Sequence, residues 1–252
     1  DGLDRSASGS FMEAATSFAV YSLPASCDHA SFGAAPHALD KVDHHGISTA
    51  RRQPTMTSIP NPLVSVVLPT DTYETIAPVL ESLRRLEAPE RLEVILVSPE
   101  ADDLRAAALG TTGFHAVRVC HTDTLAPLGA ARAVGVEACS APYVLLGETH
   151  SYLWPDALAP LLAPLVGGEA DLVLPGFING NPVNVFSWAC FLVAYSRWGA
   201  NLPSGSLAEI PAYGFLGRRD VLVDLGADLP VLLSDGEAFN RVLRKKQIRS
   251  AF

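Results

Sequence analysis

Several features that would define other protein classes are missing from this sequence. No run approaches the roughly 18 apolar residues that a membrane-spanning helix needs, so no such span is expected. No basic segment followed by an apolar one marks a secretory signal. Positive charge is scarce: 18 Lys and Arg stand against 27 Asp and Glu, a net charge of −9. This balance argues against a nucleic-acid-binding protein, which usually presents a basic face.

Cysteine is also sparse, and no Cys-x-x-Cys pair occurs, so neither a zinc ribbon nor a disulfide framework is expected. A reducing, cytoplasmic compartment is the simpler interpretation. The four cysteines are far apart in the chain: Cys27, Cys120, Cys139 and Cys190.

Residues 1–58 differ from the rest of the chain. They are rich in Ser, Ala, Gly, His and Pro and show no sustained period of 2 or 3.6. We expect a disordered or non-native leader there, with Met56 as a plausible true start. Four histidines in the segment leave a metal-binding tract open as an alternative: His29, His37, His44 and His45.

From residue 59 onward the pattern predicts one α/β domain that runs to residue 252. Short apolar runs alternate with helical periodicity, and short connections separate them, which indicates a mostly parallel sheet flanked by helices. The expected strands are 64–68, 92–97, 114–119, 143–146 and 170–174. The expected helices are 76–86, 102–109, 128–139, 155–165, 183–198, 219–225 and 234–246.

The ends of these elements carry further expectations. Asp71 and Glu74 resemble a capping box at the start of the first helix, and Ser234 is a candidate N-cap of the last one. Residues 248–252 look like the start of another strand, so we expect the domain to be incomplete at its C-terminal end.

The most informative residues follow the apolar run 143–146. Glu148 and His150 are one residue apart on an extended exit, so both side chains point to the same side. Ligands of open α/β sheets bind outside the carboxyl ends of the strands. An acid and an imidazole there can ligate Mg²⁺ or Mn²⁺ or touch a phosphate. The alternative is a polar turn that only precedes the helix at Pro155.

Five segments in order resemble family 2 glycosyltransferases of the GT-A fold. The resemblance covers residues 63 to about 250, about three quarters of the chain. The segments are Val64-Ser65-Val66-Val67-Leu68-Pro69-Thr70, Leu92-Glu93-Val94-Ile95-Leu96-Val97, Gly129-Ala130-Ala131-Arg132-Ala133-Val134-Gly135, Tyr143-Val144-Leu145-Leu146-Gly147-Glu148-Thr149-His150, and Asp235-Gly236-Glu237.

The resemblance implies transfer of a sugar from a nucleotide-sugar donor to an acceptor hydroxyl, with inversion. It also implies a divalent metal, a saccharide or lipid-linked acceptor, peripheral membrane contact at the inner face, and a role in cell-envelope polysaccharide synthesis. Asp235 or Glu237 would supply the general base, and aligning Arg244 with the family's helix arginine favours Asp235. The residues implied for donor binding are Pro69, Thr70, Asp71, Ser98, Glu100, Arg132 and Glu148, and those for the metal are Glu148 and His150.

The departures from the family pattern keep other functions open. Ser98-Pro99-Glu100 replaces the acidic pair that usually holds the nucleotide base, and Glu148-Thr149-His150 replaces Asp-x-Asp. The domain could therefore be a non-catalytic nucleotide-sugar-binding protein. Another nucleotide-dependent transferase is a further alternative. No Gly-x-Gly-x-x-Gly follows the first strand and no Walker loop occurs, which counts against a dehydrogenase or a P-loop NTPase.

Simpler alternatives exist for the remaining candidates. Arg132 could be an exposed helix arginine, and acids at 235 and 237 could only complement a helix dipole. Residues 188–195 are most simply an ordinary core helix. Aromatic and amide side chains in the same region could instead shape the acceptor site: Phe186, Trp188, Trp198, Tyr213, Asn179, Asn181 and Asn184.

Overall fold

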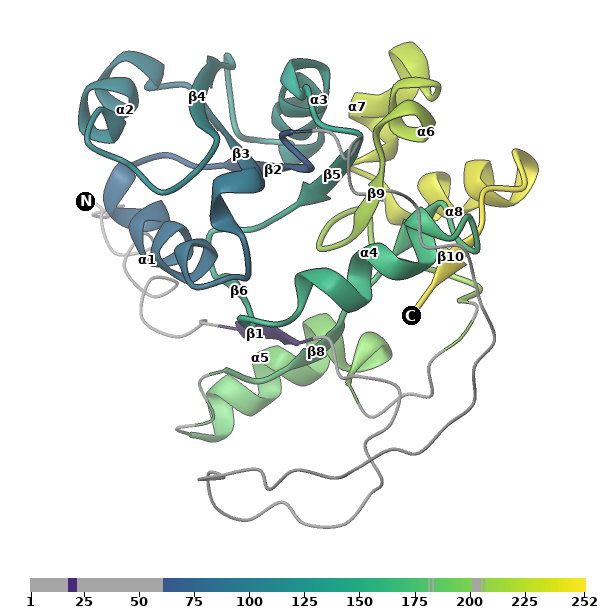
Figure 1. Cartoon of the computed structure of the whole chain (residues 1–252). Coiled ribbons are helices and arrows are strands. Elements are labelled where there is room, and N and C mark those ends of the chain that lie inside the picture. Colours follow the sequence, from purple (N-terminus) through teal and green to yellow (C-terminus); the bar gives the residue numbers. More distant parts are fainter. Residues whose placement is uncertain (1–17, 22–60, 181, 183, 201–204, 206) are drawn as a thin grey trace, which may run out of the picture.

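A seven-stranded mixed sheet forms the centre of the domain (Figure 1). The structure is a computed structural model, and it describes residues 18–21, 61–180, 182, 184–200, 205 and 207–252. The strand order is β10-β7-β9-β5-β2-β3-β4, and β9 alone in this sheet runs antiparallel to its neighbours. The α/β class with a mostly parallel sheet, predicted from the sequence, is confirmed. The strands are β2 (Val64–Pro69), β3 (Leu92–Ser98), β4 (Ala116–His121), β5 (Tyr143–Leu146), β7 (Leu172–Val173), β9 (Leu216–Arg218) and β10 (Ser250–Ala251).

Helices cover both faces of this sheet, because its strands are apolar on both sides. Val67 and Leu146 belong to one buried cluster, whereas Val66 and Leu145 belong to the other. The second cluster packs under α1 (Tyr73–Arg84), α2 (Ala101–Ala108) and α4 (Leu158–Val166). The first packs under α3 (Leu128–Ala138), α6 (Arg219–Val223), α7 (Leu229–Leu232) and α8 (Gly236–Lys245). Single 3₁₀ turns lie at η2 (Pro89–Arg91), η3 (Ser196–Trp198) and η4 (Gly226–Asp228).

A smaller three-stranded sheet lies beside the central one. Its strands are β6 (Ser151–Leu153), β1 (Phe18–Tyr21) and β8 (Gly176–Ile178), and β1 pairs with both of the others. Helix α5 (Val185–Tyr195) lies next to this sheet (Figure 1). Strand β1 falls inside the segment expected to be a leader, while the four histidines and Met56 lie outside the described residues. The domain boundary at residue 59 stays a prediction.

Two predicted caps are wrong. Helix α1 begins after Thr72, whose side chain accepts a hydrogen bond from the Thr75 amide, while Asp71 accepts one from Thr72 instead of completing a capping box with Glu74. Helix α8 is capped by Asp235 rather than by Ser234. In both cases the residue with extended backbone directly before the first helical turn serves as the cap, as the geometry requires.

Element boundaries also differ from the sequence pattern. The helix expected over 183–198 is α5 followed by η3. The strand expected over 114–119 is β4, shifted toward the C-terminus. The expectation that residues 188–195 form a core helix is wrong, because only Phe191 and Tyr195 among them are buried. An apolar composition alone could not reveal which helix lies at the surface.

Two glycines allow α3 to approach its neighbours closely. A Cβ at Gly129 would lie 2.2 Å from the Pro230 carbonyl oxygen of α7. A Cβ at Gly135 would lie 2.2 Å from Cγ1 of Val67 on β2. This packing places the first half of α3, which carries Arg132, beside both the sheet and α7.

We expect Gly135→Ala to lower the free energy of unfolding by about 1–3 kcal/mol, because the added methyl overpacks the contact with β2. Urea denaturation measures this change. Gly110→Ala is the matched control, since a Cβ there meets nothing within 4 Å. Equal stability of the two variants would show that α3 can shift away from β2 at no cost.

Candidate active site

The carboxyl ends of β2, β3 and β5 meet at one edge of the sheet, because these neighbouring strands are parallel. The side chain of Ser98 links two of these ends: its Oγ donates to the Asp71 carbonyl at 3.4 Å and accepts from the Glu100 amide at 3.1 Å. Pro69 and Thr70 are buried just before Asp71, and the Thr70 hydroxyl donates to the Thr72 carbonyl. The donor-binding candidates from Pro69 to Asp71 and at Ser98 and Glu100 therefore lie on adjacent strand ends, while their roles stay predictions.

Glu148 is the centre of a polar cluster at the end of β5. Its Oε2 accepts hydrogen bonds from the Tyr195 hydroxyl at 3.1 Å and from Ser151 Oγ at 3.2 Å. His150 Nε2 lies 3.1 Å from the Tyr195 oxygen and 3.9 Å from Glu148 Oε2. On the other side, Oε1 lies 3.8 Å from Arg132 NH2. Glu148, His150 and Arg132 thus lie together, although Arg132 is on the helix that follows β4, and β2 and β3 separate β4 from β5.

Arg132 is a buried cation, not the exposed helix arginine that was the simpler alternative. Its residue exposure is 5%, and its NH1 donates to the Leu233 carbonyl at 3.2 Å. The guanidinium carbon lies 5.0 Å from the centre of the Tyr213 ring. Its Nε is buried and has no hydrogen-bond partner among the described residues. Burial lowers the pKa of Arg132, and the neighbouring Glu148 carboxylate partly offsets this effect.

Two tyrosines complete the cluster. Burial raises the pKa of Tyr195 well above its ordinary value, and the adjacent Glu148 carboxylate raises it further. The pKa of Tyr213 is raised for the same two reasons. Both phenols are therefore neutral hydrogen-bonding groups at physiological pH. Tyr213 was a candidate from the sequence, but Tyr195 was counted with the core helix, and no sequence signal distinguished it.

Protein side chains alone do not complete a divalent-metal site in this cluster. The described residues contain no group of three or more His, Cys, Asp and Glu side chains that could hold an ion. Glu148 and His150 offer at most two ligands. The Glu148 carboxylate already accepts two hydrogen bonds and faces the positive charge of Arg132. Arg132 already supplies a counter-ion to Glu148.

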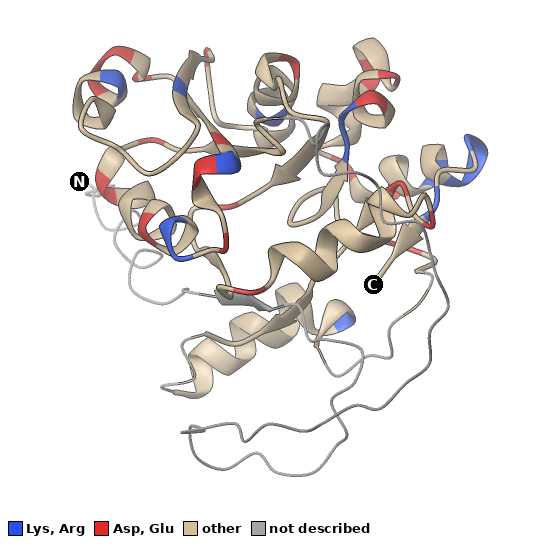
Figure 2. Ribbon diagram, viewed as in Figure 1, with Lys and Arg blue, Asp and Glu red and all other residues tan. Residues whose placement is uncertain are grey.

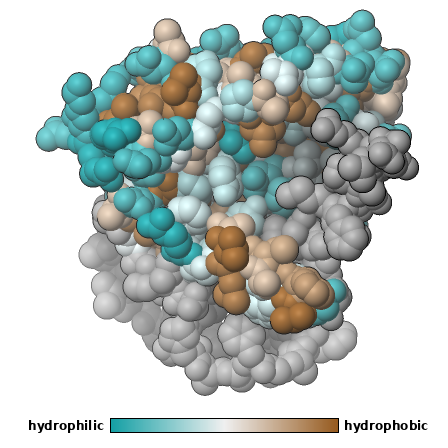
Figure 3. Space-filling view, turned by 180° about the vertical axis from the view of Figure 1, so that it is seen from behind, coloured by the Kyte–Doolittle hydropathy of each residue, from teal (hydrophilic) through white to brown (hydrophobic). Residues whose placement is uncertain are grey.

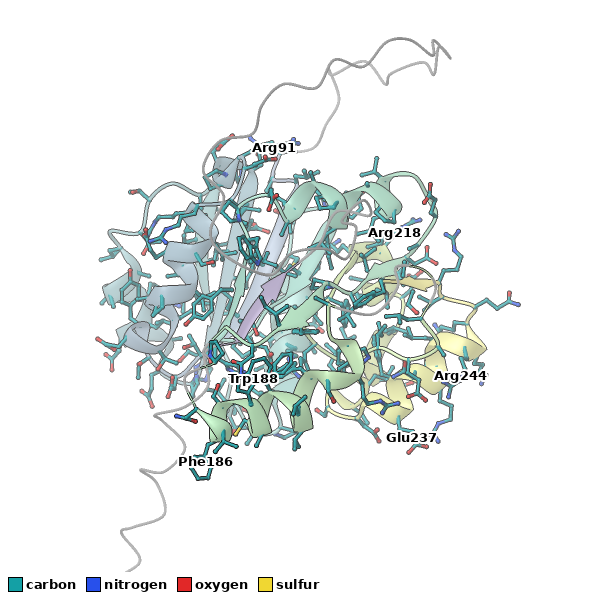
Figure 4. The ribbon with its side chains drawn as sticks, turned by 90° about the horizontal axis from the view of Figure 1, so that it is seen from below. Arg91, Phe186, Trp188, Arg218, Glu237 and Arg244 are labelled. Carbon is teal, nitrogen blue, oxygen red and sulfur yellow. The ribbon has the colours of Figure 1, made fainter. Side chains whose placement is uncertain are left out.

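The acidic pair at the start of α8 is exposed, and its two members have different partners. Asp235 Oδ1 accepts from the amides of Glu237 and Ala238, both at 3.0 Å. Glu237 pairs with Arg241 at 3.3 Å and extends outward from α8 (Figure 4). Asp235 follows Leu233, the residue whose carbonyl binds Arg132, by two positions. Of the two acids, Asp235 is thus the nearer in sequence to the residue that Arg132 contacts.

The amides considered for the acceptor site are structural where the structure describes them. Asn179 exchanges hydrogen bonds with the Ser187 hydroxyl, and Asn184 caps α5. Asn181 lies outside the described residues. Among the aromatic residues, Trp198 donates to the Glu209 carbonyl, and Phe186 and Trp188 are exposed and extend from different sides of α5 (Figure 4).

Comparison with known families decides what kind of domain presents this site. The glycosyl transferase family 2 profile matches residues 65–226, more than half of the chain. The chain belongs to glycosyl transferase family 2. The matched range contains Arg132, Glu148 and His150 and ends before Asp235. Curated protein sequences gave no significant match.

Solved structures with a similar fold include TarS of S. aureus. The chain is 17% identical to one TarS structure, with a TM-score of 0.48. The aligned region covers 68% of this chain and 33% of the TarS chain. This chain is 18% identical to TarS 1–349 in complex with UDP, with a TM-score of 0.45 and coverages of 68% and 54%. For the complex with UDP-GlcNAc the identity is 17%, the TM-score 0.46 and the coverages 68% and 52%. This family 2 chain thus spans between a third and about half of the length of these proteins.

Among the described residues, no helix combines the length and the apolar character needed to cross a bilayer.

Proposed function

We propose that this family 2 domain transfers a sugar from a nucleotide-sugar donor to an acceptor hydroxyl, with inversion at the anomeric carbon. The observation that carries the proposal is the cluster of Arg132, Glu148 and His150 at the carboxyl edge of the sheet. Ligands of open α/β sheets bind at that edge. The ends of β2 and β3, with Asp71 and Ser98, would hold the nucleotide beside the cluster.

The chemistry requires positive charge near the leaving group. When the bond between the sugar and the diphosphate breaks, the diphosphate gains negative charge, and preorganised cationic donors stabilise it best in a dry site. Arg132 is the buried cation of the cluster, and its Nε–H lacks a partner among the described residues. Glu148 holds the guanidinium in place. The positive charge in the proposed mechanism comes from Arg132.

The proposed base is Asp235. As the acceptor oxygen forms its bond to the anomeric carbon, the bond to the diphosphate oxygen breaks on the opposite face of the sugar. The hydroxyl proton passes to the Asp235 carboxylate. Its Oδ1 is held by two amides of α8, so the carboxylate is fixed in orientation before the acceptor binds.

The acceptor proposed for this reaction is a saccharide or a lipid-linked saccharide. Action in the cytoplasm at the inner face of the membrane, in the synthesis of a cell-envelope polysaccharide, is the accompanying proposal. The alternative is a domain of the same family that binds a nucleotide sugar without transferring it. The replacement of Asp-x-Asp by Glu148-Thr149-His150 favours that alternative.

A thermal-shift screen of UDP-, GDP- and dTDP-sugars tests the proposal. One nucleotide sugar at 100 times its Kd should stabilise the protein by about 2.7 kcal/mol. The shift should be equal in EDTA and in Mn²⁺. Transfer to an added acceptor, or slow hydrolysis of the bound donor, then separates the enzyme from the non-catalytic alternative. Absence of any shift across the panel would contradict nucleotide-sugar binding.

A further inference from the structure

Helix α5 exposes a concentration of apolar side chains. Residues 172–196 contain no charged residue, although 18% of the whole chain is charged. Figure 2 shows α5 free of acidic and basic residues, while red and blue positions occur on the helices around the central sheet. Segment 172–196 thus contributes no charged side chain to this surface.

The exposed side of α5 is wide. Only a narrow stripe of Ser187, Phe191 and Tyr195 is buried. The large apolar residues on the remaining surface are Val185 (72% exposed), Phe186 (74%), Trp188 (45%), Leu192 (54%) and Val193 (89%). Viewed from behind, apolar side chains gather in the lower part of the molecule, where α5 lies (Figure 3). We call these five residues the α5 face. Contiguous exposed apolar surface of this kind marks an interaction site.

The size and charge of the α5 face favour a bilayer over a protein partner. A helix of 11 residues is about 17 Å long and 10 Å wide. Such a surface is smaller than the roughly 800 Å² per partner that a stable dimer buries. Inserting apolar side chains into the boundary between headgroups and acyl chains requires no matched partner shape, and the binding strength grows with the apolar area that is buried. Phe and Trp, both present on the face, are typical of helices that lie in this boundary.

The α5 face is also connected to the active site. Tyr195, on the buried stripe of the same helix, donates to Glu148, and Ser187 anchors the helix to Asn179. A bilayer seated on α5 would therefore lie beside the Glu148 cluster. A lipid-linked acceptor could reach the site from that surface, a consequence that rests on the proposed function.

We propose that the α5 face inserts into the interfacial layer of a lipid bilayer and holds the domain at a membrane surface. The driving force is apolar burial, not attraction to anionic lipid, because α5 has no basic residue. Binding should therefore not need anionic lipid and should persist at high salt, where electrostatic attraction is screened.

Vesicle sedimentation of the full chain tests this proposal. The vesicles are phosphatidylcholine alone or phosphatidylcholine with phosphatidylglycerol, in low and high salt. The parent should sediment with both, and Phe186→Ser/Val193→Ser should lower the partition coefficient at least tenfold. Val231→Ser is the matched control, because Val231 is 65% exposed but lies on α7.

Each outcome decides the matter. Thermal melts of the variants first establish that the fold is kept, as expected for exposed positions. Equal sedimentation of parent and double variant, or none by the parent, would overturn the proposal. A concentration-dependent dimer that the double substitution abolishes would assign the face to a second copy instead. Because sedimentation measures no transfer, its failure is distinct from failure of the proposed reaction.

Discussion

Asp235→Asn is expected to slow sugar transfer by about 10²–10⁴-fold, the usual contribution of a general base. The substitution removes the basic carboxylate but keeps the helix cap, because asparagine caps helices as well as aspartate does. The amides of Glu237 and Ala238 should still find an oxygen acceptor, so the fold and the donor Kd should be unchanged. Initial rates at saturating donor and acceptor, with donor binding measured by calorimetry, check both halves of this expectation.

Glu237→Gln is the matched control. Glu237 opens the same helix, is exposed and pairs with Arg241 on the helix surface, so its loss should change the rate only slightly. Transfer by the Asp235 variant at the parental rate would mean that the carboxylate is only a helix cap. A larger loss in the Glu237 variant would assign the base to Glu237.

Arg132→Met is expected to have a large effect on both stability and donor binding. The substitution leaves the largely buried Glu148 carboxylate, whose side chain is 11% exposed, without its counter-ion, and removing one partner of a buried pair costs about 3–5 kcal/mol. It also removes the bond to the Leu233 carbonyl, which fastens α3 to the segment leading into α8. Urea denaturation should show the loss, and calorimetry should show weaker binding of the donor selected by the screen.

The double variant Arg132→Met/Glu148→Gln shows how much of the stability loss comes from the uncompensated charge of Glu148 and how much from lost packing of Arg132. Neutralising both partners removes the uncompensated charge, so the double variant should be more stable than Arg132→Met alone. Donor binding should stay weak, because the cation is still missing. Arg244→Met is the exposed control on α8 (Figure 4). If Arg132→Met and Arg244→Met were equally stable and bound the donor equally well, Arg132 would have neither the structural nor the binding role.

The sequence by itself determined the parallel strands of the central sheet and the edge at which the site lies. Strand β5 has the predicted bounds 143–146, and Glu148 and His150 lie at its exit. Strand β2 begins where the apolar run predicted. These features depend on local residue pattern and on the rule that parallel strands share a carboxyl edge, so they can be deduced without knowledge of distant contacts.

Only the tertiary structure decided how the site residues are partnered. The burial of Arg132 under Tyr213, its bond to Leu233 and the contact of Tyr195 with Glu148 join residues 47 to 101 positions apart. The placement of β9 antiparallel between β5 and β7 and the exposure of α5 depend in the same way on long-range packing. Periodicity reports which residues share a face of one element, but not which other element, or which solvent, that face meets. For this reason a run as apolar as residues 185–195 could be assigned to the surface only from the tertiary structure.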